Sequence, residues 1–259
     1  MLRSWLYVPA HSARFLAKAH ERGADAIILD LEDAVPEADK DGARAGLADA
    51  VKSAGRNGAE LFVRINSGTR RHADAEAAAR AGAGLIVAKA ELGELDGLAA
   101  FGTKLIAMLE SPAAVLDARE FARHTAVTGL LVGSEDLAMA LGATPVPEVL
   151  RFPKLLVHYA AKAEGKLSLG LLRSVADYAD LAAVEAAGRE ARLHGFDGAT
   201  CVHPSVVPVL NAAFAPSTEE IAWAERVLAA AAGGEGAFTV DGRMVDAPVI
   251  ARARDILGR

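Results

Sequence analysis

Two carboxylates that directly follow apolar runs are the first residues in this sequence that could do chemistry. The segment GLLVGSEDL, residues 129–137, passes from an apolar run into Asp136, and the segment KLIAMLE ends in Glu110. Two carboxylates held close together repel unless one is protonated or a cation lies between them. Mg²⁺ is the natural cation, because it takes oxygen ligands, keeps several waters and is often held by only one or two carboxylates. The sequence has neither the histidine and cysteine spacing of zinc sites nor an EF-hand loop. A fold that places Glu110 and Asp136 on neighbouring strands would therefore make a magnesium site.

The residues just before Asp136 have the types expected of an anion-binding turn. Gly133, Ser134 and Glu135 would form the turn into a helix that starts near Asp136. Free backbone N–H groups at such a helix start can hold a substrate carboxylate. The alternative is that Ser134, Glu135 or Asp136 only caps the helix, as such residues commonly do. Other charged residues predicted at the same rim favour the binding site.

Arg64 stands near the end of LFVRIN, a strand-like run that is otherwise apolar. A guanidinium is always charged and can grip a carboxylate or an enolate oxygen through two parallel hydrogen bonds. Arg64 could instead, or in addition, form an ion pair with Glu32, Asp33 or Glu110. Glu32 and Asp33, in the segment DLEDAV, could hydrogen-bond metal-bound waters or could cap the next helix.

Three further side chains have the chemistry for a role but also a plainer explanation. Lys89 could form a Schiff base, although a metal site makes imine chemistry superfluous and an ion pair with Glu91 or Glu110 would explain it. His203 could donate a proton or contact a thioester cofactor, or could hydrogen-bond the backbone at a strand end. Cys201 is expected to be a small buried strand residue.

These residues would meet only if the strands that precede them end at one place. Short, nearly continuous apolar runs alternate with longer amphipathic segments such as 12–22 and 175–194, which indicates parallel strands covered on both faces by helices. The pattern predicts a (β/α)8 TIM barrel, whose catalytic groups gather at the C-terminal ends of the strands. A doubly wound sheet has the same alternation, but the first strand-to-helix turn has no Gly-x-Gly-x-x-Gly loop, and there is no Walker motif. The expected strands are residues 4–9, 26–32, 60–66, 84–90, 104–110, 128–133, 166–172 and 198–204.

The last part of the chain has no place in a minimal barrel. We therefore expect a barrel domain over residues 1–215 and a C-terminal extension over residues 216–259. A helix over 217–231 is followed by a break at Gly233-Gly234 and by the segment AFTVDGRMVDAPVIARARDIL. The glycines would let this segment pack on the barrel rim or reach a neighbouring subunit.

Composition narrows the class of protein. The chain has 259 residues, a formal net charge of −6 and acidic residues mixed with basic ones, which argues against a nucleic-acid partner. No apolar run approaches the roughly 18 residues that span a bilayer, so no membrane association is expected. The single cysteine cannot form an internal disulfide and fits a reducing compartment. A cytoplasmic location is the prediction.

Several segments stand together in an order and spacing that are highly specific. They are RSWLYVP, GADAIILDLEDAVPEADKDGAR, LFVRIN, LIAMLESPAAV, GLLVGSEDLAMALG, GFDGATCVHPSVVPVLNAAFAPSTEEIAWAERVL and FTVDGRMVDAPVIARARDIL. Over nearly its whole length the chain resembles the citrate lyase β-subunit family, within the wider group of HpcH/HpaI aldolases and malyl-CoA lyases.

The resemblance implies a Mg²⁺-dependent TIM-barrel lyase that cleaves a 3-hydroxyacyl thioester to a 2-oxo acid and an acetyl thioester. By its motifs, Glu110 and Asp136 match the family's metal ligands, and Arg64 matches the arginine that binds the oxo acid. Asp246 matches an aspartate that in several relatives enters a neighbouring subunit's site as an acid or base, which implies a homo-oligomer. Without the resemblance, Asp246 has the position of a helix cap.

The chain also departs from the family pattern. Ala88 stands where many relatives carry proline, and Leu171-Leu172-Arg173 stands where many carry an Ile-Asp stretch. The second change should alter recognition of the acyl group or of its thioester carrier, which could be coenzyme A or an acyl-carrier protein. Three functions stay open: a lyase on malyl or citryl thioesters, an enzyme of the malate-synthase or thioesterase kind, and a non-catalytic oxo-acid-binding subunit of a lyase complex.

Overall fold

The computed structural model describes residues 2–232 and 237–258, and the chain divides into two compact units between Phe214 and Ala215. None of the helices in these described residues is long and apolar enough to cross a membrane.

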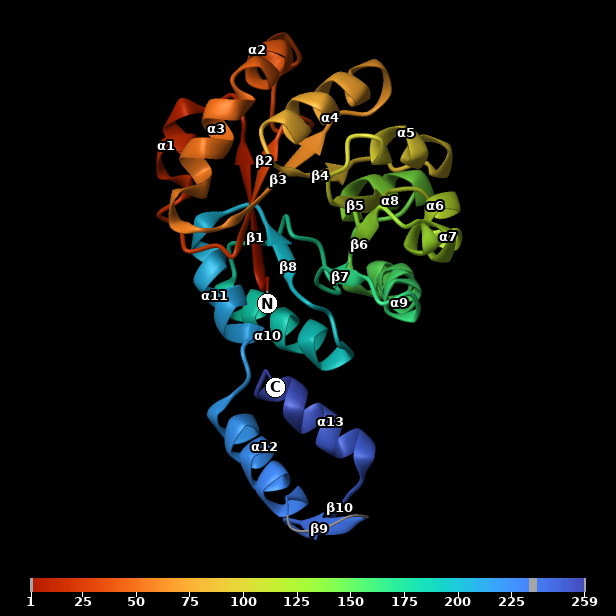
Figure 1. The fold of residues 1–259 in the computed structure, drawn as a ribbon. Helices are drawn as coiled ribbons and strands as arrows, with labels where there is room; N and C mark the ends of the chain where they lie inside the picture. The colour runs from red at the N-terminus through yellow and green to blue at the C-terminus, as the bar shows by residue number, and fades with distance from the viewer. Residues whose placement is uncertain (1, 233–236, 259) are drawn as a thin grey trace. The chain divides into compact units, whose positions relative to one another are not determined.

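The first unit is built on one eight-stranded parallel sheet that curls into a barrel (Figure 1). Neighbouring strands follow one another in sequence from β7 to β1, and β1 pairs with β8. The ring is completed between β7 and β8 by a bridge from Leu169 to Gly198 and a hydrogen bond from Gly170 N–H to Gly198 O at 2.9 Å. The predicted (β/α)8 barrel is confirmed. The strands are β1 (Ser4–Pro9), β2 (Ala26–Asp30), β3 (Glu60–Ile65), β4 (Gly84–Val87), β5 (Leu105–Leu109), β6 (Val127–Val132), β7 (Leu167–Leu169) and β8 (Ala199–Cys201).

Helices cover the outside of this sheet and present one apolar face to it. In α3, for example, the buried residues Leu47, Ala50 and Ala54 follow helical spacing. The α-helices of this unit are α1 (Ala13–Ala19), α2 (Lys40–Ala45), α3 (Leu47–Ala54), α4 (Arg71–Arg80), α5 (Leu95–Ala99), α6 (Pro112–Leu116), α7 (Ala118–Arg123), α8 (Ser134–Leu141), α9 (Pro147–Ala163), α10 (Leu181–His194) and α11 (Val207–Ala213). Short 3₁₀ turns lie at η1 (Glu37–Asp39), η2 (Gly55–Asn57), η3 (Gly68–Arg70), η4 (Leu92–Glu94) and η5 (Pro204–Val206).

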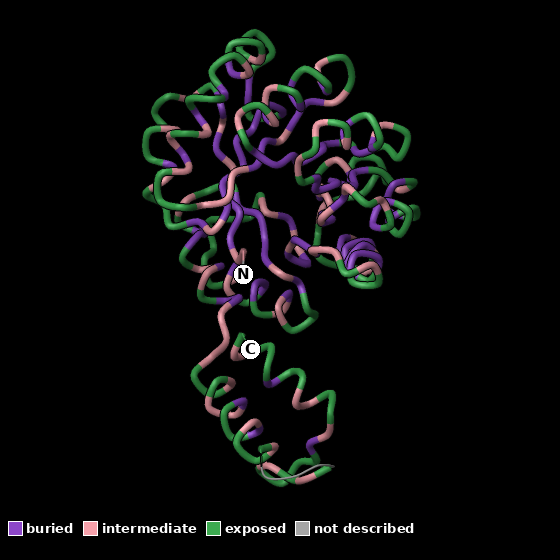
Figure 2. Tube along the Cα trace, viewed as in Figure 1, coloured by how far each residue is buried: buried purple, intermediate pink, exposed green. Residues whose placement is uncertain are grey.

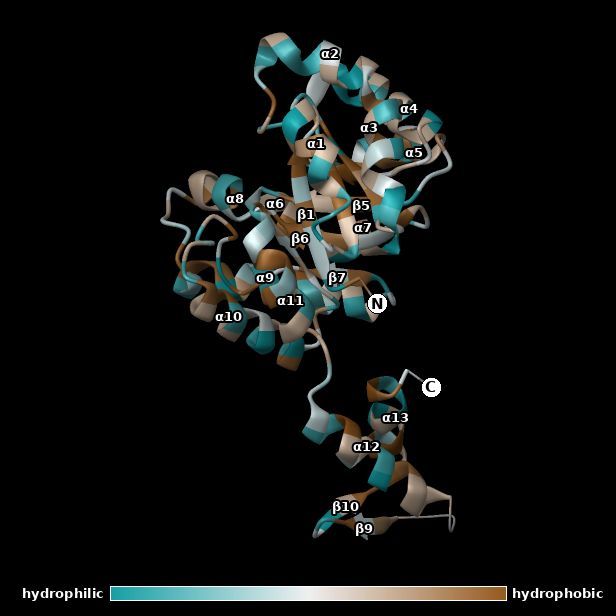
Figure 3. Cartoon of the chain, turned by 90° about the vertical axis from the view of Figure 1, so that its left-hand side faces the viewer, coloured by the Kyte–Doolittle hydropathy of each residue, from teal (hydrophilic) through white to brown (hydrophobic). Residues whose placement is uncertain are grey.

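The strands are buried on both faces, which explains their continuous apolar sequence (Figures 2 and 3). Successive side chains point to opposite faces of a strand. Leu6 and Val8 therefore pack under the helices, whereas Trp5 packs inside the barrel, where its ring lies 4.7 Å from that of Phe62. The interior is a packed core and not a pore, so a ligand can bind only at an end of the barrel.

All eight predicted strands are present, but most end earlier than predicted. The prediction ran β2 on to Glu32, whereas the side chain of Asp30 accepts the N–H groups of Glu32 and Ala34 and turns the chain out of the sheet. The predicted helix 175–194 is wrong at its start, because α10 begins at Leu181 and is capped by Asp180. Residues 170–180 form a loop instead. Polar and irregular backbone at the strand ends was thus mistaken for regular structure.

The second unit contains α12 (Thr218–Ala231), an antiparallel hairpin of β9 (Phe238–Val240) and β10 (Arg243–Val245), and α13 (Ala247–Ile256). Ser217 and Glu220 form a reciprocal capping box at the start of α12. The two helices and the hairpin share a small apolar core of their own. The predicted break at Gly233-Gly234 lies outside the described residues, and the predicted packing on the rim or on another subunit stays a prediction.

Gly198 is a position where the barrel has no room for a side chain. A Cβ there would lie 2.8 Å from the backbone oxygen of Arg3 and even closer to that of Leu2. We expect Gly198→Ala to lower the free energy of unfolding by about 1–3 kcal/mol, because backbone atoms must move to admit the methyl group. Urea denaturation followed by circular dichroism measures this loss. Gly42→Ala is the matched control, since a Cβ at Gly42 in α2 meets nothing within 4 Å. Equal stability of the two variants would contradict the prediction.

Candidate active site

A cavity of about 500 Å³ opens at the C-terminal ends of the barrel strands. Its lining comes from the ends of β1, β2, β3, β5, β6 and β8 and from the loop after β7. The residues predicted for the site that line it are Asp33, Arg64, Glu110, Gly133, Ser134, Glu135 and Asp136. Residues from distant parts of the sequence therefore meet in one place, as the barrel prediction required.

Asp30 and Arg64 are neighbours in the register of β2 and β3. Arg64 Nε lies 2.7 Å from Asp30 Oδ1, and Arg64 Nη2 lies 2.6 Å from Asp30 Oδ2. Asp30 is 1% exposed, so this two-bond pair is held away from water. Breaking such a pair would leave an uncompensated buried charge, which makes it a firm anchor. Asp30 therefore fixes the direction of the Arg64 guanidinium.

The other end of the guanidinium meets two more carboxylates. Arg64 Nη1 lies 2.9 Å from Glu32 Oε2 and 3.1 Å from Asp33 Oδ2, and the guanidinium carbon lies 5.1 Å from the ring centre of Tyr7. Burial lowers the pKa of Arg64, but the bonds to Asp30 outweigh this effect, so its pKa is raised. The ion pairs predicted with Glu32 and Asp33 are present, and Asp30 is the third partner.

Glu110 and Gly133 leave neighbouring strands at the same level, because β5 and β6 are paired in register up to Leu109 and Val132. Gly133 N–H donates to Leu109 O at 3.2 Å. The side chain of Glu110 lies directly against the Cα of Gly133. A Cβ at position 133 would be 2.7 Å from Glu110 Cδ, closer than atoms pack. Glycine at 133 is thus a condition for the position of Glu110.

Glu110 is nearly buried, with only 8% of the residue exposed to solvent. Its Oε2 accepts the N–H of Lys89 at 2.6 Å. Burial raises the pKa of Glu110 to about 7, the Lys89 hydrogen bond acts against this, and the nearby charges of Asp136 and Glu32 add to it. Asp136, in the first turn of the helix after β6, lines the same cavity as Glu110, so the two predicted metal ligands face one space.

Lys89 holds a left-handed backbone conformation, with φ of 48°, which costs on the order of 1 kcal/mol in a residue with a side chain. This turn points its N–H at Glu110. Its Nζ lies 3.2 Å from Glu32 Oε1 and 3.7 Å from Asp136 Oδ2. We predicted Glu91 or Glu110 as partner of the ammonium, and the structure gives Glu32 and Asp136 instead because the left-handed turn redirects the side chain.

The protonation of Lys89 also bears on the Schiff-base alternative. Burial lowers its pKa, but the carboxylates of Glu32 and Asp136 outweigh burial, so the pKa of Lys89 is raised. A Schiff-base lysine needs a neutral amine and hence a lowered pKa. The surroundings of Lys89 therefore favour a fixed positive charge.

Helix α8 begins at Ser134, two residues before the predicted start, with Gly133 at the N-cap. Glycine offers no side-chain oxygen, so the predicted capping by Ser134, Glu135 or Asp136 is wrong for the N-cap position itself. These three residues occupy the first turn, where backbone N–H groups have no acceptor within the helix. This positive end of the helix faces the cavity and suits an anionic ligand. Glu135 is held by Ser174, whose hydroxyl donates to Oε1 at 2.5 Å.

The charges around the cavity do not balance. Six carboxylates stand against two cations, so negative charge is in excess. The carboxylates are Asp30, Glu32, Asp33, Glu110, Glu135 and Asp136, and the cations are Arg64 and Lys89. The described residues contain no group of three or more His, Cys, Asp or Glu side chains that could hold a metal by themselves. The donor set fits Mg²⁺, which needs only one or two carboxylates when waters and substrate complete its shell.

The remaining predicted residues have simple surroundings. Asp246 lies in the second unit, where it is the N-cap of α13 and accepts the N–H of Val249 at 3.4 Å. His203 Nδ1 accepts the N–H of Ser205 at 3.2 Å, as expected of a histidine at a strand end. Cys201 is buried, and burial raises the pKa of its thiol to about 12. The predicted acid or base role of Asp246 stays a prediction.

Three residues of the site had no assigned role in the sequence analysis. Asp30 holds Arg64, Tyr7 lies beside the Arg64 guanidinium, and Ser174 holds Glu135. Alternation along β1 gives a signal for Tyr7, because it shares the inner face with Trp5. Nothing in the sequence signals Ser174, which lies between the predicted strand 166–172 and the predicted helix 175–194.

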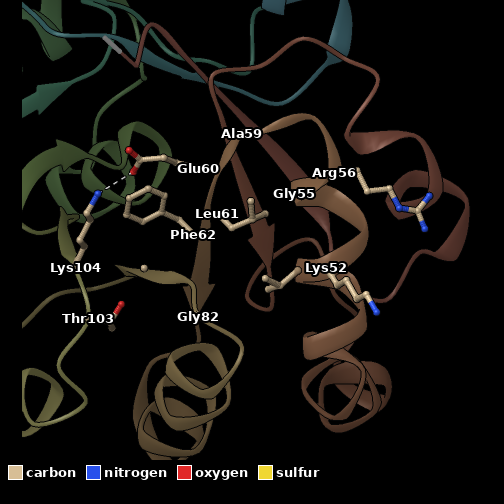
Figure 4. A pocket seen from close by; sticks show the side chains of 12 residues that line it. Lys52, Gly55, Arg56, Ala59, Glu60, Leu61, Phe62, Gly82, Thr103 and Lys104 are labelled. Carbon is tan, nitrogen blue, oxygen red and sulfur yellow. Dashed lines mark hydrogen bonds and ion pairs between the residues drawn. The ribbon is translucent and has the colours of Figure 1, made fainter.

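A second cavity, of about 540 Å³, lies at the opposite ends of the strands (Figure 4). Glu60 and Lys104 point toward each other there and form an ion pair at 3.0 Å, while Lys52 and Arg56 extend away from them. Its charged groups are thus solvated or paired and do not converge on a common point. The chemistry gathers at the other end of the barrel.

Comparison with known proteins shows the family of this chain. The sequence model of the family described as HpcH/HpaI aldolase/citrate lyase matches residues 3–204. The chain belongs to this family of lyases. The resemblance found in the sequence is therefore confirmed. A citrate lyase subunit beta-like protein of Mycobacterium tuberculosis strain H37Rv is 36% identical to this chain, and the match covers 98% of this chain and 94% of that protein.

Two further relatives show the range within the family. A (3S)-malyl-CoA thioesterase of Cereibacter sphaeroides strain ATCC 17029 is also 36% identical, over 99% of this chain and 94% of that protein. The crystal structure of protein CitE from Mycobacterium tuberculosis in complex with magnesium, acetoacetate and coenzyme A has a TM-score of 0.84 and 35% identity. That match covers 99% of this chain and 97% of that chain.

The raised pKa of Glu110 makes a stability prediction for the metal-free protein. We expect Glu110→Gln to be more stable than the wild type at pH 8 and to lose this advantage at pH 4.5. Because the folded pKa is raised from 4.5 to about 7, the stability that protonated Glu110 contributes is complete below 4.5 and is lost as the pH rises through 7. The difference is at most about 3 kcal/mol. Urea denaturation in EDTA across this range measures it.

The exposed Glu225 in α12 supplies the control, since Glu225→Gln removes a carboxylate that is not buried. If the difference in the free energy of unfolding between wild type and Glu110→Gln does not depend on pH, burial does not raise the pKa of Glu110.

Proposed function

We propose that this chain is a Mg²⁺-dependent carbon–carbon lyase that cleaves a malyl-type or citryl-type 3-hydroxyacyl thioester to a 2-oxo acid and an acetyl thioester. The observation that carries the proposal is that Glu110, just after β5, and Asp136, in the first turn of α8, line one cavity together with the anchored guanidinium of Arg64. A divalent cation offsets the charges of the two carboxylates, and its substrate must carry oxygen ligands that complete the shell.

In this proposal Glu110 and Asp136 are the metal ligands, and Glu32 and Asp33 hydrogen-bond metal-bound waters. Related crystal structures support the choice of metal, because a citrate lyase beta subunit of M. tuberculosis, 32% identical to this chain, is described as complexed with oxaloacetate and magnesium. When bound, Mg²⁺ would polarise the hydroxyl group of the substrate and lower its pKa. The ammonium of Lys89, close to both Glu32 and Asp136, would have to move aside or turn toward the substrate.

Arg64 and the start of α8 would bind the carboxylate of the oxo-acid half. Of the three carboxylates on Arg64, only Asp33 is exposed, with 62% of its side chain accessible. Nη1 is therefore the donor that an incoming carboxylate can take over with the least rearrangement. The backbone N–H groups of Ser134 and Glu135 supply the second set of donors. Both sets neutralise the charge that stays on the oxo acid as the bond breaks.

The reaction breaks the bond between the carbon that bears the hydroxyl and the carbon next to the thioester. A base removes the hydroxyl proton, the hydroxyl carbon becomes the carbonyl of the oxo acid, and the electron pair of the broken bond forms the thioester enolate. Protonation of the enolate carbon gives the acetyl thioester. We propose Asp246 of a neighbouring subunit for this proton, which makes a homo-oligomer part of the proposal. At the start of α13, Oδ1 of Asp246 accepts a hydrogen bond from the N–H of Val249.

A second candidate is the related thioesterase or synthase activity, in which the thioester is hydrolysed or formed by condensation. The 36% identity to a (3S)-malyl-CoA thioesterase favours it. A third candidate, an oxo-acid-binding subunit of a larger lyase, is favoured by the 30% identity to the citrate lyase subunit beta of Haemophilus influenzae. The thioester carrier, coenzyme A or an acyl-carrier protein, belongs to the same open choice. A cytoplasmic location remains a prediction of the sequence.

One product analysis separates these candidates. The purified chain is incubated with malyl-CoA or citryl-CoA, with Mg²⁺ or with EDTA, and products are identified by mass spectrometry. The lyase yields glyoxylate or oxaloacetate together with acetyl-CoA, and only with Mg²⁺. A thioesterase yields free malate or citrate and coenzyme A. Binding of oxaloacetate without turnover indicates the non-catalytic subunit, and turnover undiminished in EDTA overturns the metal proposal.

Asp136→Asn tests the proposed ligand directly. We expect at least about a hundredfold loss of kcat/KM, because removing one charged ligand weakens the metal and its hold on the transition state. Isothermal titration with Mg²⁺ should show a matching loss of affinity. Asp49→Asn, which removes a carboxylate from the exposed surface of α3, should leave both quantities unchanged. Retained Mg²⁺ affinity in Asp136→Asn would move the metal to other ligands.

Gly133→Ala tests whether the fit of Glu110 against the backbone matters. The added methyl group collides with the Glu110 side chain, so we expect Mg²⁺ to bind about tenfold or more weakly, because displaced ligands lose the geometry that Mg²⁺ demands. Titration with Mg²⁺ measures the change. Gly142→Ala lies at the other end of α8 and is the control for general damage to this helix. An unchanged affinity would mean that Glu110 is not a ligand.

A further inference from the structure

Lys154 in α9 is a buried lysine with no place in the proposed chemistry. Only 4% of the residue is exposed, and its Nζ donates to Leu171 O at 2.8 Å and to Arg173 O at 2.7 Å. Burial lowers the pKa of Lys154 to about 7, and the carboxylate of Glu135 acts against this effect. A lysine occupies this place although burial makes a positive charge there unfavourable. Holding the two carbonyl groups is what it does that an apolar residue cannot do.

Both carbonyl groups belong to the loop over residues 170–180, between β7 and α10. They stand on either side of Leu172, which is buried together with Leu171. This part of the loop is neither helix nor strand, so its buried carbonyl groups need donors from elsewhere in the protein. Lys154 supplies them from a helix that precedes β7 in the sequence.

The next residue of the loop, Ser174, reaches the candidate active site. It is 4% exposed, its Oγ donates to Glu135 Oε1 at 2.5 Å, and it accepts the N–H of Ala176 at 3.1 Å. Ser174, Ala176 and Tyr178 line the same cavity as Asp136. The ring of Tyr178 stacks on His203, with ring centres 5.1 Å apart. The loop is therefore one wall of the cavity, and the segment clamped by Lys154 connects that wall to β7.

We propose that Lys154 is a positioning residue: by holding the carbonyl groups of Leu171 and Arg173 it keeps Ser174 on Glu135 and so sets the width of the cavity next to Asp136. The width of the cavity decides which acyl groups fit, so Lys154 would be a determinant of the substrate size that the enzyme accepts. The proposal rests on the proposed function for the identity of the substrate, but the clamp on the loop does not.

Hydrogen exchange measured by mass spectrometry tests the clamp without any substrate. Lys154→Met keeps the length and bulk of the side chain and removes its donors. We expect peptides that cover residues 170–180 to exchange at least about tenfold faster, while peptides from β5 and β6 stay unchanged. Lys52→Met, which removes a lysine from the exposed surface of α3, should change neither. Unchanged exchange of the loop in a folded Lys154→Met protein overturns the proposal.

Steady-state kinetics then separate positioning from catalysis. We expect Lys154→Met to raise KM for the acyl thioester about tenfold and to lower kcat much less, with partial recovery in Lys154→Arg, whose guanidinium can still donate to two carbonyl groups. If the wild type turns over no thioester, the proposed function fails while the exchange result still decides the clamp.

A second variant covers the case that Lys154→Met does not fold. Ser174→Ala removes one hydroxyl group and breaks the next link, between the loop and Glu135. It should raise KM in the same way with normal stability. An unchanged KM in Ser174→Ala, or a loss confined to kcat, overturns the proposal.

Discussion

The active end of this barrel is shaped by an excess of negative charge held in partly buried space. Asp30 and Glu110 are each almost fully covered, and neither can move away, because one is locked to Arg64 and the other is wedged against Gly133. Charges of one sign are tolerated together only when something compensates them. In the protein alone the compensation comes from the positive charges of Arg64 and Lys89, and the pKa of Glu110 is raised to about 7. A divalent cation is the compensation that the same geometry best accepts.

The loops around the cavity are held by a second set of cations, which bind backbone carbonyl groups. Each clamp lies just after a strand and fixes the segment that carries a site residue. Lys40 donates to Leu31 O and Glu32 O after β2, Arg71 donates to Ala88 O and Lys89 O after β4, and Lys154 donates to Leu171 O and Arg173 O after β7. A carbonyl group that has left the sheet needs a donor, and a long basic side chain can reach it from a neighbouring helix. The ends of the strands thereby stay rigid although they are irregular.

Membership of the family limits the reaction but does not choose among its members. A thioesterase and citrate lyase β-type proteins are about equally similar to this chain. The metal, the arginine and the start of α8 would serve all of these reactions, because each handles an oxo-acid or hydroxy-acid carboxylate beside a thioester. The choice depends on what surrounds the thioester: the wall after β7, water access, and the group that protonates the enolate. The wall after β7 contains Leu171-Leu172-Arg173, the stretch at which the sequence analysis expected altered recognition of the acyl group or its carrier.

The sequence alone determined the barrel, its eight strands and the set of polar residues at their ends. Continuous apolar runs indicate strands that are buried on both faces. Few folds bury strands in this way when the strands alternate with helices along the chain. What it could not determine is which polar side chains touch. Glu91 and Glu110 were the predicted partners of the Lys89 ammonium, whereas the left-handed turn at Lys89 places it beside Glu32 and Asp136. Ion pairing depends on distances of a few ångströms across strands far apart in sequence, and such distances exist only in the folded chain.

The loop after β7 is a second example of a conformation that only the tertiary structure determines. Residues 170–172 were predicted to continue the strand, and residues 175–180 were predicted to begin the helix. In the folded protein Nζ of the buried Lys154, from another helix, donates to two carbonyl groups of this loop and holds it as an irregular wall. A sequence pattern indicates only the local conformational preference of a segment. The conformation of this loop depends instead on a hydrogen-bond donor from an earlier helix, which is close to it only in the folded protein.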